Sequence, residues 1–169
     1  DEGLVYVANQ DGILEYDGAS WQIIAGPEGS TPRRLAIAAD GRLLIASDTG
    51  SGVLETDEQG RARYRSLGSS SGGGSNQDDA ARFLTLGETT YIVTAFSIVA
   101  HRAGTATEIT PPAPVQHAFI SGGRLFLVLW GRGLNELDGG MLRSVPGQEA
   151  FDDDEVRLSV ALDNASTLL

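Results

Sequence analysis

One six-residue phrase recurs along this chain and constrains its fold more than any other feature. Residues 12–17 read Gly-Ile-Leu-Glu-Tyr-Asp, residues 52–57 read Gly-Val-Leu-Glu-Thr-Asp, and residues 133–138 read Gly-Leu-Asn-Glu-Leu-Asp. The spacing is about 40 residues per unit, with a degraded copy at 97–102. A period of this length is typical of proteins that repeat one small supersecondary unit side by side.

The second unit shows how each repeat is organised. Asp40-Gly41 joins two short apolar runs, which is a strong signal for a two-residue β-hairpin turn. No segment of useful length has helical periodicity. The pattern predicts strands at 4–8, 12–17 and 21–24; at 34–39, 43–47, 53–56 and 62–67; at 82–86, 90–95, 98–102 and 107–110; at 116–120, 125–130, 134–138 and 141–145; and at 156–162 and 167–169.

Four antiparallel strands at this period are what one blade of a β-propeller requires. The runs 43–46 and 125–129 are apolar without alternation, so both faces of these strands are expected to be buried between neighbouring sheets. We predict an all-β partial propeller of about four four-stranded antiparallel blades. It forms one domain over residues 1–169, with approximate units 1–25, 33–67, 81–112, 115–146 and an incomplete 156–169.

The pattern leaves open how the ring is completed. The last unit could lend a strand to the first, but we favour a fragment of a longer propeller or two chains forming a ring together, because bare sheet edges are prone to aggregation. The Ser- and Gly-rich stretch 68–79 is expected to be a flexible surface loop.

The composition excludes several classes of function. There are 23 acidic and 12 basic residues, a formal net charge of −11, which argues against binding nucleic acid or an anionic membrane surface. There is no cysteine, so disulfides and thiolate chemistry are excluded. The longest apolar run, 125–130, is too short to span a membrane. No signal peptide is recognised, and a mature or excised piece of a longer protein is expected.

Long loops are predicted to gather at one edge of the propeller, where the second strand joins the third and each blade joins the next. Function favours long loops on a rigid scaffold, so this edge is the predicted binding face. These loops are 9–11, 27–33, 47–51, 68–80, 130–132 and 146–155. From them we take Trp130, Arg132, Asp48, Arg33 and Asp11 as candidate ligand-binding residues.

Trp130 and Arg132 are the most site-like pair, because a flat ring beside a guanidinium suits a sugar or a carboxylate. The alternative is that Trp130 caps a blade and Arg132 is solvated. The acidic run 152–155 could bind calcium, but it lacks the ligand spacing of a calcium loop and is better explained as a solvated turn.

Other polar residues are interpreted as structural. His101 and His117 have no partner at a catalytic or metal-binding spacing, so we expect ordinary strand histidines. The glutamate of the repeated phrase (Glu15, Glu55 and Glu136) recurs once per unit, which indicates a structural role. No catalytic residue, metal or cofactor is expected.

Two stretches resemble the repeat of two-component regulator propellers. They are residues 6–21, which read YVANQDGILEYDGASW, and residues 34–54, in which an Arg-led strand precedes Asp40-Gly41 and ends near Gly52-Val53-Leu54. The resemblance covers 1–67 well, 115–145 moderately and 68–110 poorly, and Leu44 stands where the family usually has tryptophan. It implies the extracytoplasmic sensor of a bacterial membrane receptor, whose kinase, cyclase or DNA-binding output lies outside this chain.

On this basis we expect a non-catalytic, periplasmic ligand-binding sensor. Its ligand would be a small molecule or an oligosaccharide, and its protein partner a second copy or the remainder of the propeller. Nucleic acid is not an expected partner, and the membrane is reached only through segments outside this chain. Two alternatives remain: a propeller enzyme acting on glycans, as a lyase or hydrolase, and a protein-interaction scaffold.

Overall fold

The computed structural model describes residues 3–26, 30–69, 81–147, 160–161 and 167–168, and all regular structure in these ranges is β-strand. Sheet A contains β1 (Val5–Asn9), β2 (Gly12–Tyr16) and β3 (Trp21–Ile24). Sheet B contains β4 (Pro32–Ile37), β5 (Leu43–Ser47), β6 (Gly50–Thr56) and β7 (Ala62–Ser69). Sheet C contains β8 (Arg82–Leu86), β9 (Thr89–Val93), β10 (Ile98–Arg102) and β11 (Thr105–Ile109). Sheet D contains β12 (Val115–Ser121), β13 (Arg124–Leu129), β14 (Gly133–Asp138) and β15 (Met141–Ser144), and sheet E contains β16 (Val160–Ala161) and β17 (Thr167–Leu168).

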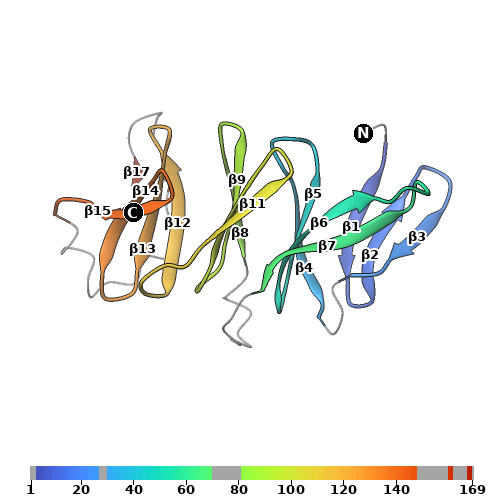
Figure 1. Ribbon diagram of the computed structural model, residues 1–169, viewed down its shortest axis with the longest axis horizontal. Coiled ribbons are helices and arrows are strands. Elements are labelled where there is room, and N and C mark those ends of the chain that lie inside the picture. The colour runs from blue at the N-terminus through green and yellow to red at the C-terminus, as the bar shows by residue number, and fades with distance from the viewer. Residues whose placement is uncertain (1–2, 27–29, 70–80, 148–159, 162–166, 169) are drawn as a thin grey trace.

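Every sheet is built from consecutive strands that pair antiparallel, as a propeller blade is. Sheets A to D follow one another side by side in chain order (Figure 1). The three full copies of the repeated phrase lie in β2, β6 and β14, in three different sheets. The predicted all-β fold with separate antiparallel blades is therefore confirmed. Within the described ranges there is no helix long and apolar enough to cross a membrane.

A hairpin joins β4 and β5 at the predicted place, but its loop is longer than the two-residue turn that was predicted. Gly41 has a φ of 82°, a left-handed conformation that residues with a side chain adopt only with strain. The N–H of Ala38 donates to the carbonyl oxygen of Arg42 at 2.8 Å, and the N–H of Gly41 donates to that of Ala38 at 2.9 Å. These bonds enclose Ala39 as well as Asp40-Gly41, so the location of the turn is confirmed and its predicted length is wrong.

The core is divided into layers between neighbouring sheets. Leu43 and Ile45 of β5 pack with Ile13 and Ile24 of sheet A. The alternate residues of β5, Leu44 and Ala46, pack instead against sheet C. Val93 and Ile98 of sheet C in turn pack with the β13 residues Leu125, Leu127 and Leu129. The predicted burial of both faces of the second strand is confirmed, because a sheet lies on each side of it.

The repeated glutamate ties strands together within its own sheet. Glu15 accepts a hydrogen bond from the side-chain amide of Gln22 on β3. Glu55 accepts from Arg65 on β7 at 2.8 Å, and also from Arg42 at 3.2 Å. Glu136 accepts from Arg124 on β13 at 3.2 Å. The structural role predicted for this position agrees with these contacts.

Some strand boundaries differ from the prediction. β4 begins at Pro32, and β7 continues to Ser69, into the stretch predicted to be a loop from residue 68. The cause is pairing: Gly50 and Ser51 extend β6 and give Gly68 and Ser69 partners. Sheet C is regular, although its sequence repeat is degraded. Residues 70–79 and 152–155, for which a loop and an acidic turn were predicted, lie outside the described residues.

Candidate ligand-binding groove

Two of the loops predicted to share one edge of the molecule are linked there by a hydrogen bond, and a third is linked to the connection before β12. The N–H of Asp48 donates to the carbonyl oxygen of Thr31 at 3.3 Å, and the N–H of Trp130 donates to that of Pro114 at 2.8 Å. The turns from β1 to β2 and from β13 to β14 lie at the lower edge in Figure 1. The turns from β4 to β5, β8 to β9 and β12 to β13 lie at the upper edge. The lower edge is therefore where the candidate residues are found.

At this edge a groove of about 440 Å³ lies between sheets A and B. It is bounded by the turn from β1 to β2, the connection from β3 to β4, and the turn from β5 to β6. Most of the side chains that line it are polar. The described residues that line it are Gln10, Asp11, Gly12, Ala25, Gly26, Ser30, Thr31 and Asp48.

Gly12 allows the two walls of the groove to approach. It has a φ of 146°, and a Cβ at this position would collide with the carbonyl oxygen of Ile24 and lie 3.3 Å from the backbone nitrogen of Gly26. A side chain here would force the β3 end of sheet A away from β2. The glycine of the repeated phrase is thus required for close backbone packing at the groove.

Arg33 and Asp48 form a bidentate ion pair beside the groove. The Nε of Arg33 is 2.6 Å from Oδ1 of Asp48, and its Nη2 is 3.0 Å from Oδ2. Asp48 raises the pKa of the Arg33 guanidinium, through the hydrogen bond first and its negative charge second. The pair fixes the direction of the Asp48 carboxylate at the groove wall.

A β-bulge explains why Arg33 reaches Asp48. Pro32 pairs with Ser47 and Arg34 pairs with Ala46, so Arg33 is an extra residue without a partner in the ladder. Bulges re-aim a side chain and often occur next to functional sites. The bulge places Arg33 at the start of β4, next to the turn that carries Asp48.

The structure brings three of the five candidate residues together. Asp11 and Asp48 line the groove, and Arg33 is paired with Asp48. Trp130 and Arg132 lie in the turn from β13 to β14, away from the groove, so the five do not form one site. Trp130 is 64% exposed, and Arg132 is exposed as well.

Trp130 nevertheless occupies the position in sheet D that Asp48 occupies in sheet B. Sheet D also has a bulge on its first strand, between Val115 and His117, and Val115 pairs with Leu129, the residue before Trp130. In sheet B, Pro32 pairs with Ser47, the residue before Asp48. The two candidates therefore mark one repeated loop position that carries different chemistry in different blades.

Sequence reasoning did not identify Gln10, Ser30 or Thr31 as site residues. Ser30 Oγ accepts a hydrogen bond at 3.1 Å from the N–H of Thr49, which holds the connection from β3 to β4 against the β5–β6 turn. The only signal available was that these polar residues fall in two of the predicted long loops. The partner loops are far apart in sequence, so their meeting depends on how sheets A and B pack.

The two histidines lie in strands, as predicted, and are buried away from this groove. His101 in β10 is 1% exposed, and its Nδ1 is 3.8 Å from Oδ2 of Asp40 in the β4–β5 turn. Burial lowers the pKa of His101 and, to a lesser degree, the charge of Asp40 opposes this. His117 in β12 also has a lowered pKa, mainly because of burial. Among the described residues no group of three His, Asp or Glu could hold a metal ion.

The groove can recognise a polar ligand through several kinds of hydrogen bond. Carboxylates of Asp11 and Asp48 accept, while the side-chain amide of Gln10 and the hydroxyls of Ser30 and Thr31 both donate and accept. The charge of Asp48 is balanced by Arg33, which leaves Asp11 as the net charge at the wall. Such a lining suits a ligand rich in hydroxyl groups that carries no negative charge.

No protein-family model matches the chain, and no curated protein matches it. Among solved structures it is similar to virginiamycin B lyase from Staphylococcus aureus, with a TM-score of 0.51 and 15% identity over 89% of this chain and 55% of that one. A streptogramin B lyase gives 0.49 and 14% over 88% and 53%. The calcium-binding protein regucalcin from Agrobacterium tumefaciens gives 0.43 and 16% over 88% and 59%. This chain thus spans less than two thirds of the length of each. The likeness to virginiamycin B lyase shows a shared β-propeller fold.

Proposed function

We propose that this chain is the ligand-binding propeller of an extracytoplasmic bacterial receptor, and that it acts by binding and not by catalysis. The observation that carries the proposal is the polar groove between sheets A and B, in which Asp11 and the oriented Asp48 face the same space. The groove lies on the edge that carries the longer loops, as binding sites on rigid scaffolds commonly do.

The sequence repeat supports the receptor part of the proposal. Residues 6–21 and 34–54 resemble two-component regulator propellers, which sense ligands outside the cytoplasm. Ligand binding across two sheets would favour one relative arrangement of those sheets. The resulting signal can be no larger than the difference in the ligand's affinity for the two arrangements.

The groove's chemistry indicates a neutral oligosaccharide as the ligand. Carboxylates and amides bind sugar hydroxyls through directed hydrogen bonds, whereas an acidic sugar would be repelled by Asp11 and by a chain of net charge −11. We expect calorimetry with neutral xylo-, manno- and malto-oligosaccharides to reveal at least one binder. Oligogalacturonate, which is acidic, should not bind.

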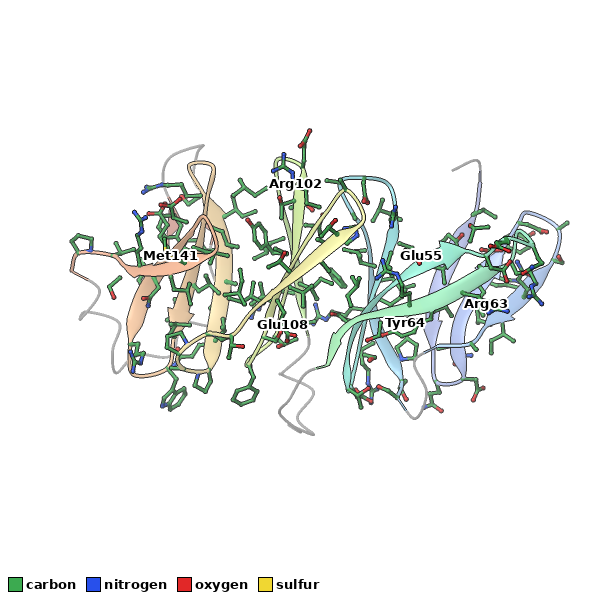
Figure 2. All side chains as sticks on the ribbon, in the orientation of Figure 1. Glu55, Arg63, Tyr64, Arg102, Glu108 and Met141 are labelled. Atoms are coloured by element: carbon green, nitrogen blue, oxygen red, sulfur yellow. The ribbon has the colours of Figure 1, made fainter. Side chains whose placement is uncertain are left out.

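Two variants test whether the binding occurs in this groove. Asp11→Asn and Asp48→Asn should each weaken affinity by about 10-fold or more, because a lost hydrogen bond to a charged group costs ~1.5–3 kcal/mol. Glu88→Gln is the matched control, since Glu88 is 79% exposed and pairs with Arg102, which lies at the upper edge (Figure 2). Binding that both groove variants leave unchanged, or turnover of the sugar by the purified protein, would contradict the proposal.

A further inference from the structure

The turn between β4 and β5 of sheet B is fastened to sheet C by two hydrogen bonds. The N–H of Ala39 donates to Oγ1 of Thr90 in β9 at 3.0 Å. The N–H of Gly104, in the turn from β10 to β11, donates to Oδ2 of Asp40 at 3.1 Å. Each bond joins two separate sheets, since β4 and β5 belong to sheet B and β9 to β11 belong to sheet C. We name these two contacts the B–C latch.

His101 of β10 is buried beside the B–C latch. It pairs with Thr90, and two residues earlier Val99 pairs with Ile92. Val99 and Ile92 belong to the apolar cluster shared with sheet B, so the side chains of His101 and Thr90 also face that sheet. His101 is 1% exposed, and its Nδ1 is 3.8 Å from Oδ2 of Asp40, the oxygen that takes part in the latch.

The surroundings of His101 suit a neutral imidazole and not an imidazolium. Within the part of the chain that the structure describes, neither ring nitrogen has a hydrogen-bond partner. A protonated ring carries a charge and two N–H donors, all of which would need partners in a place closed to water. The Asp40 oxygen lies beyond hydrogen-bond distance and already accepts from Gly104. The closed latch therefore disfavours the proton.

Four charged side chains of sheet B interact with His101 across the contact between the two sheets. They are Asp40 and Arg42 of the β4–β5 turn, Glu55 of β6 and Arg65 of β7. The two carboxylates attract a proton at His101 and the two guanidinium groups repel it, so these charges oppose one another. Burial has the largest effect, and it lowers the pKa of His101 below its ordinary value of 6.5. The direction of this shift agrees with the missing hydrogen bonds.

We propose that protonation of His101 releases the β4–β5 turn from sheet C, so that the B–C latch opens in acid. Opening lets water reach both ring nitrogens, so the open form binds a proton more tightly than the closed form. A ligand shifts an equilibrium towards the form that it binds better, and here that ligand is the proton. The device lies between sheets B and C and does not depend on what binds in the groove between sheets A and B.

The direction of the pH dependence follows from the two forms of His101. In the open form its pKa returns towards 6.5, whereas in the closed form its pKa is lower. The latch is therefore at full strength above about pH 6.5 and weakens as the pH falls below that value. The equilibrium constant for opening rises by up to about 10-fold per pH unit, until the closed form is protonated as well.

Hydrogen exchange of the two latch amides measures the opening directly. Protection factors of the Ala39 and Gly104 N–H groups, corrected for the intrinsic pH dependence of exchange, are followed from about pH 7.5 to about pH 5. They should stay constant to about pH 6.5 and then fall by about 5- to 10-fold by about pH 5.5. The N–H of Thr94, which bonds to the carbonyl oxygen of Ser97 beyond the other end of β9, should keep its protection.

A variant without the titrating group makes the result specific. His101→Phe keeps an aromatic ring, and it removes no hydrogen bond that the described residues make. Its latch protection should change by less than about 2-fold over the same pH range. His117→Phe is the matched control, because His117 is the other histidine and is also buried, but lies in sheet D. That variant should keep the pH dependence of the wild type at Ala39.

A direct titration keeps the test valid if His101→Phe does not fold. The Cε1 resonance of His101 in the wild type reports its protonation, and proton uptake and loss of Ala39 protection must then follow one curve. Three results would overturn the proposal. They are latch protection that does not change with pH, a fall that persists in His101→Phe and so belongs to the carboxylates, and a parallel fall at Thr94, which would mean unfolding of the whole sheet.

Discussion

Sheets A and B carry the same repeated phrase, yet their strands have opposite environments. Leu43, Leu44 and Ile45 in β5 of sheet B are all at most 7% exposed, because sheets A and C lie on either side. Val5 and Val7 in β1 of sheet A are 49% and 41% exposed, although they are just as apolar. The exposed fraction of an apolar side chain in this fold therefore depends on whether a neighbouring sheet covers it, and not on how apolar the residue is.

The largest difference in unfolding free energy should appear when one buried apolar residue of sheet B and one exposed apolar residue of sheet A are each replaced by alanine. Leu44→Ala leaves a cavity between sheets B and C and should cost about 2–5 kcal/mol of unfolding free energy. Val7→Ala removes methyl groups that already face solvent in the monomer and should cost less than about 0.5 kcal/mol. Urea unfolding at low protein concentration measures both. Equal costs would mean that the two sheets do not differ in the way described.

A smaller difference should separate two tyrosines on opposite faces of sheet A. Tyr6 packs toward sheet B, and burial first, then the hydrogen bond and charge of Glu15, raise its pKa to about 12. Tyr16 lies on the opposite face of sheet A, and its hydroxyl donates to the nearby carbonyl oxygen of Gly18 at 2.8 Å. Tyr6→Phe should cost about 1 kcal/mol and Tyr16→Phe about half a kcal/mol or less.

The pH dependence of the stabilisation by Tyr6 provides a second measurement of how its environment differs from that of Tyr16. Its pKa is higher in the folded protein than the ordinary value of 10.0, so its contribution is complete below pH 10 and is lost as the pH rises toward 12. Ultraviolet titration of the wild type against Tyr6→Phe should show one phenol missing from the late-titrating group. A variant that instead loses a phenol titrating near pH 10 would contradict the burial of Tyr6.

Much of the fold followed from the sequence because its signals are local. Asp40-Gly41 sets the hairpin through its own backbone preference, and the unalternating run of β5 implies a sheet on each side. The bulge at Arg33 and the extension of β7 to Ser69 were not predictable, because they depend on pairing between strands. Sheet C also shows that a regular blade can form where the repeated phrase has decayed, since it needs apolar strands more than the phrase itself.

The candidate site was predictable in part for the same reason. Asp11, Arg33 and Asp48 were found from loop length and residue type, and the structure places them at one groove. Their separation from Trp130 follows from the order of the units, because Trp130 lies in the unit 115–146 and the other three lie at the first two units. Gln10, Ser30 and Thr31 carry no motif, and only the packing of sheet A on sheet B brings them to the groove.

The repeats form separate sheets packed face to face, and the other described residues leave the face of sheet A that carries Ile23 exposed. Methyl NOE spectroscopy on the wild-type chain at low protein concentration tests this arrangement. We expect NOEs joining Ile13 to Ile45, and Val53 to Ile92, with none from Ile23 to residues of sheets B to D. An Ile23 methyl that shows NOEs to those sheets, or an Ile13 methyl that shows none to sheet B, would contradict it.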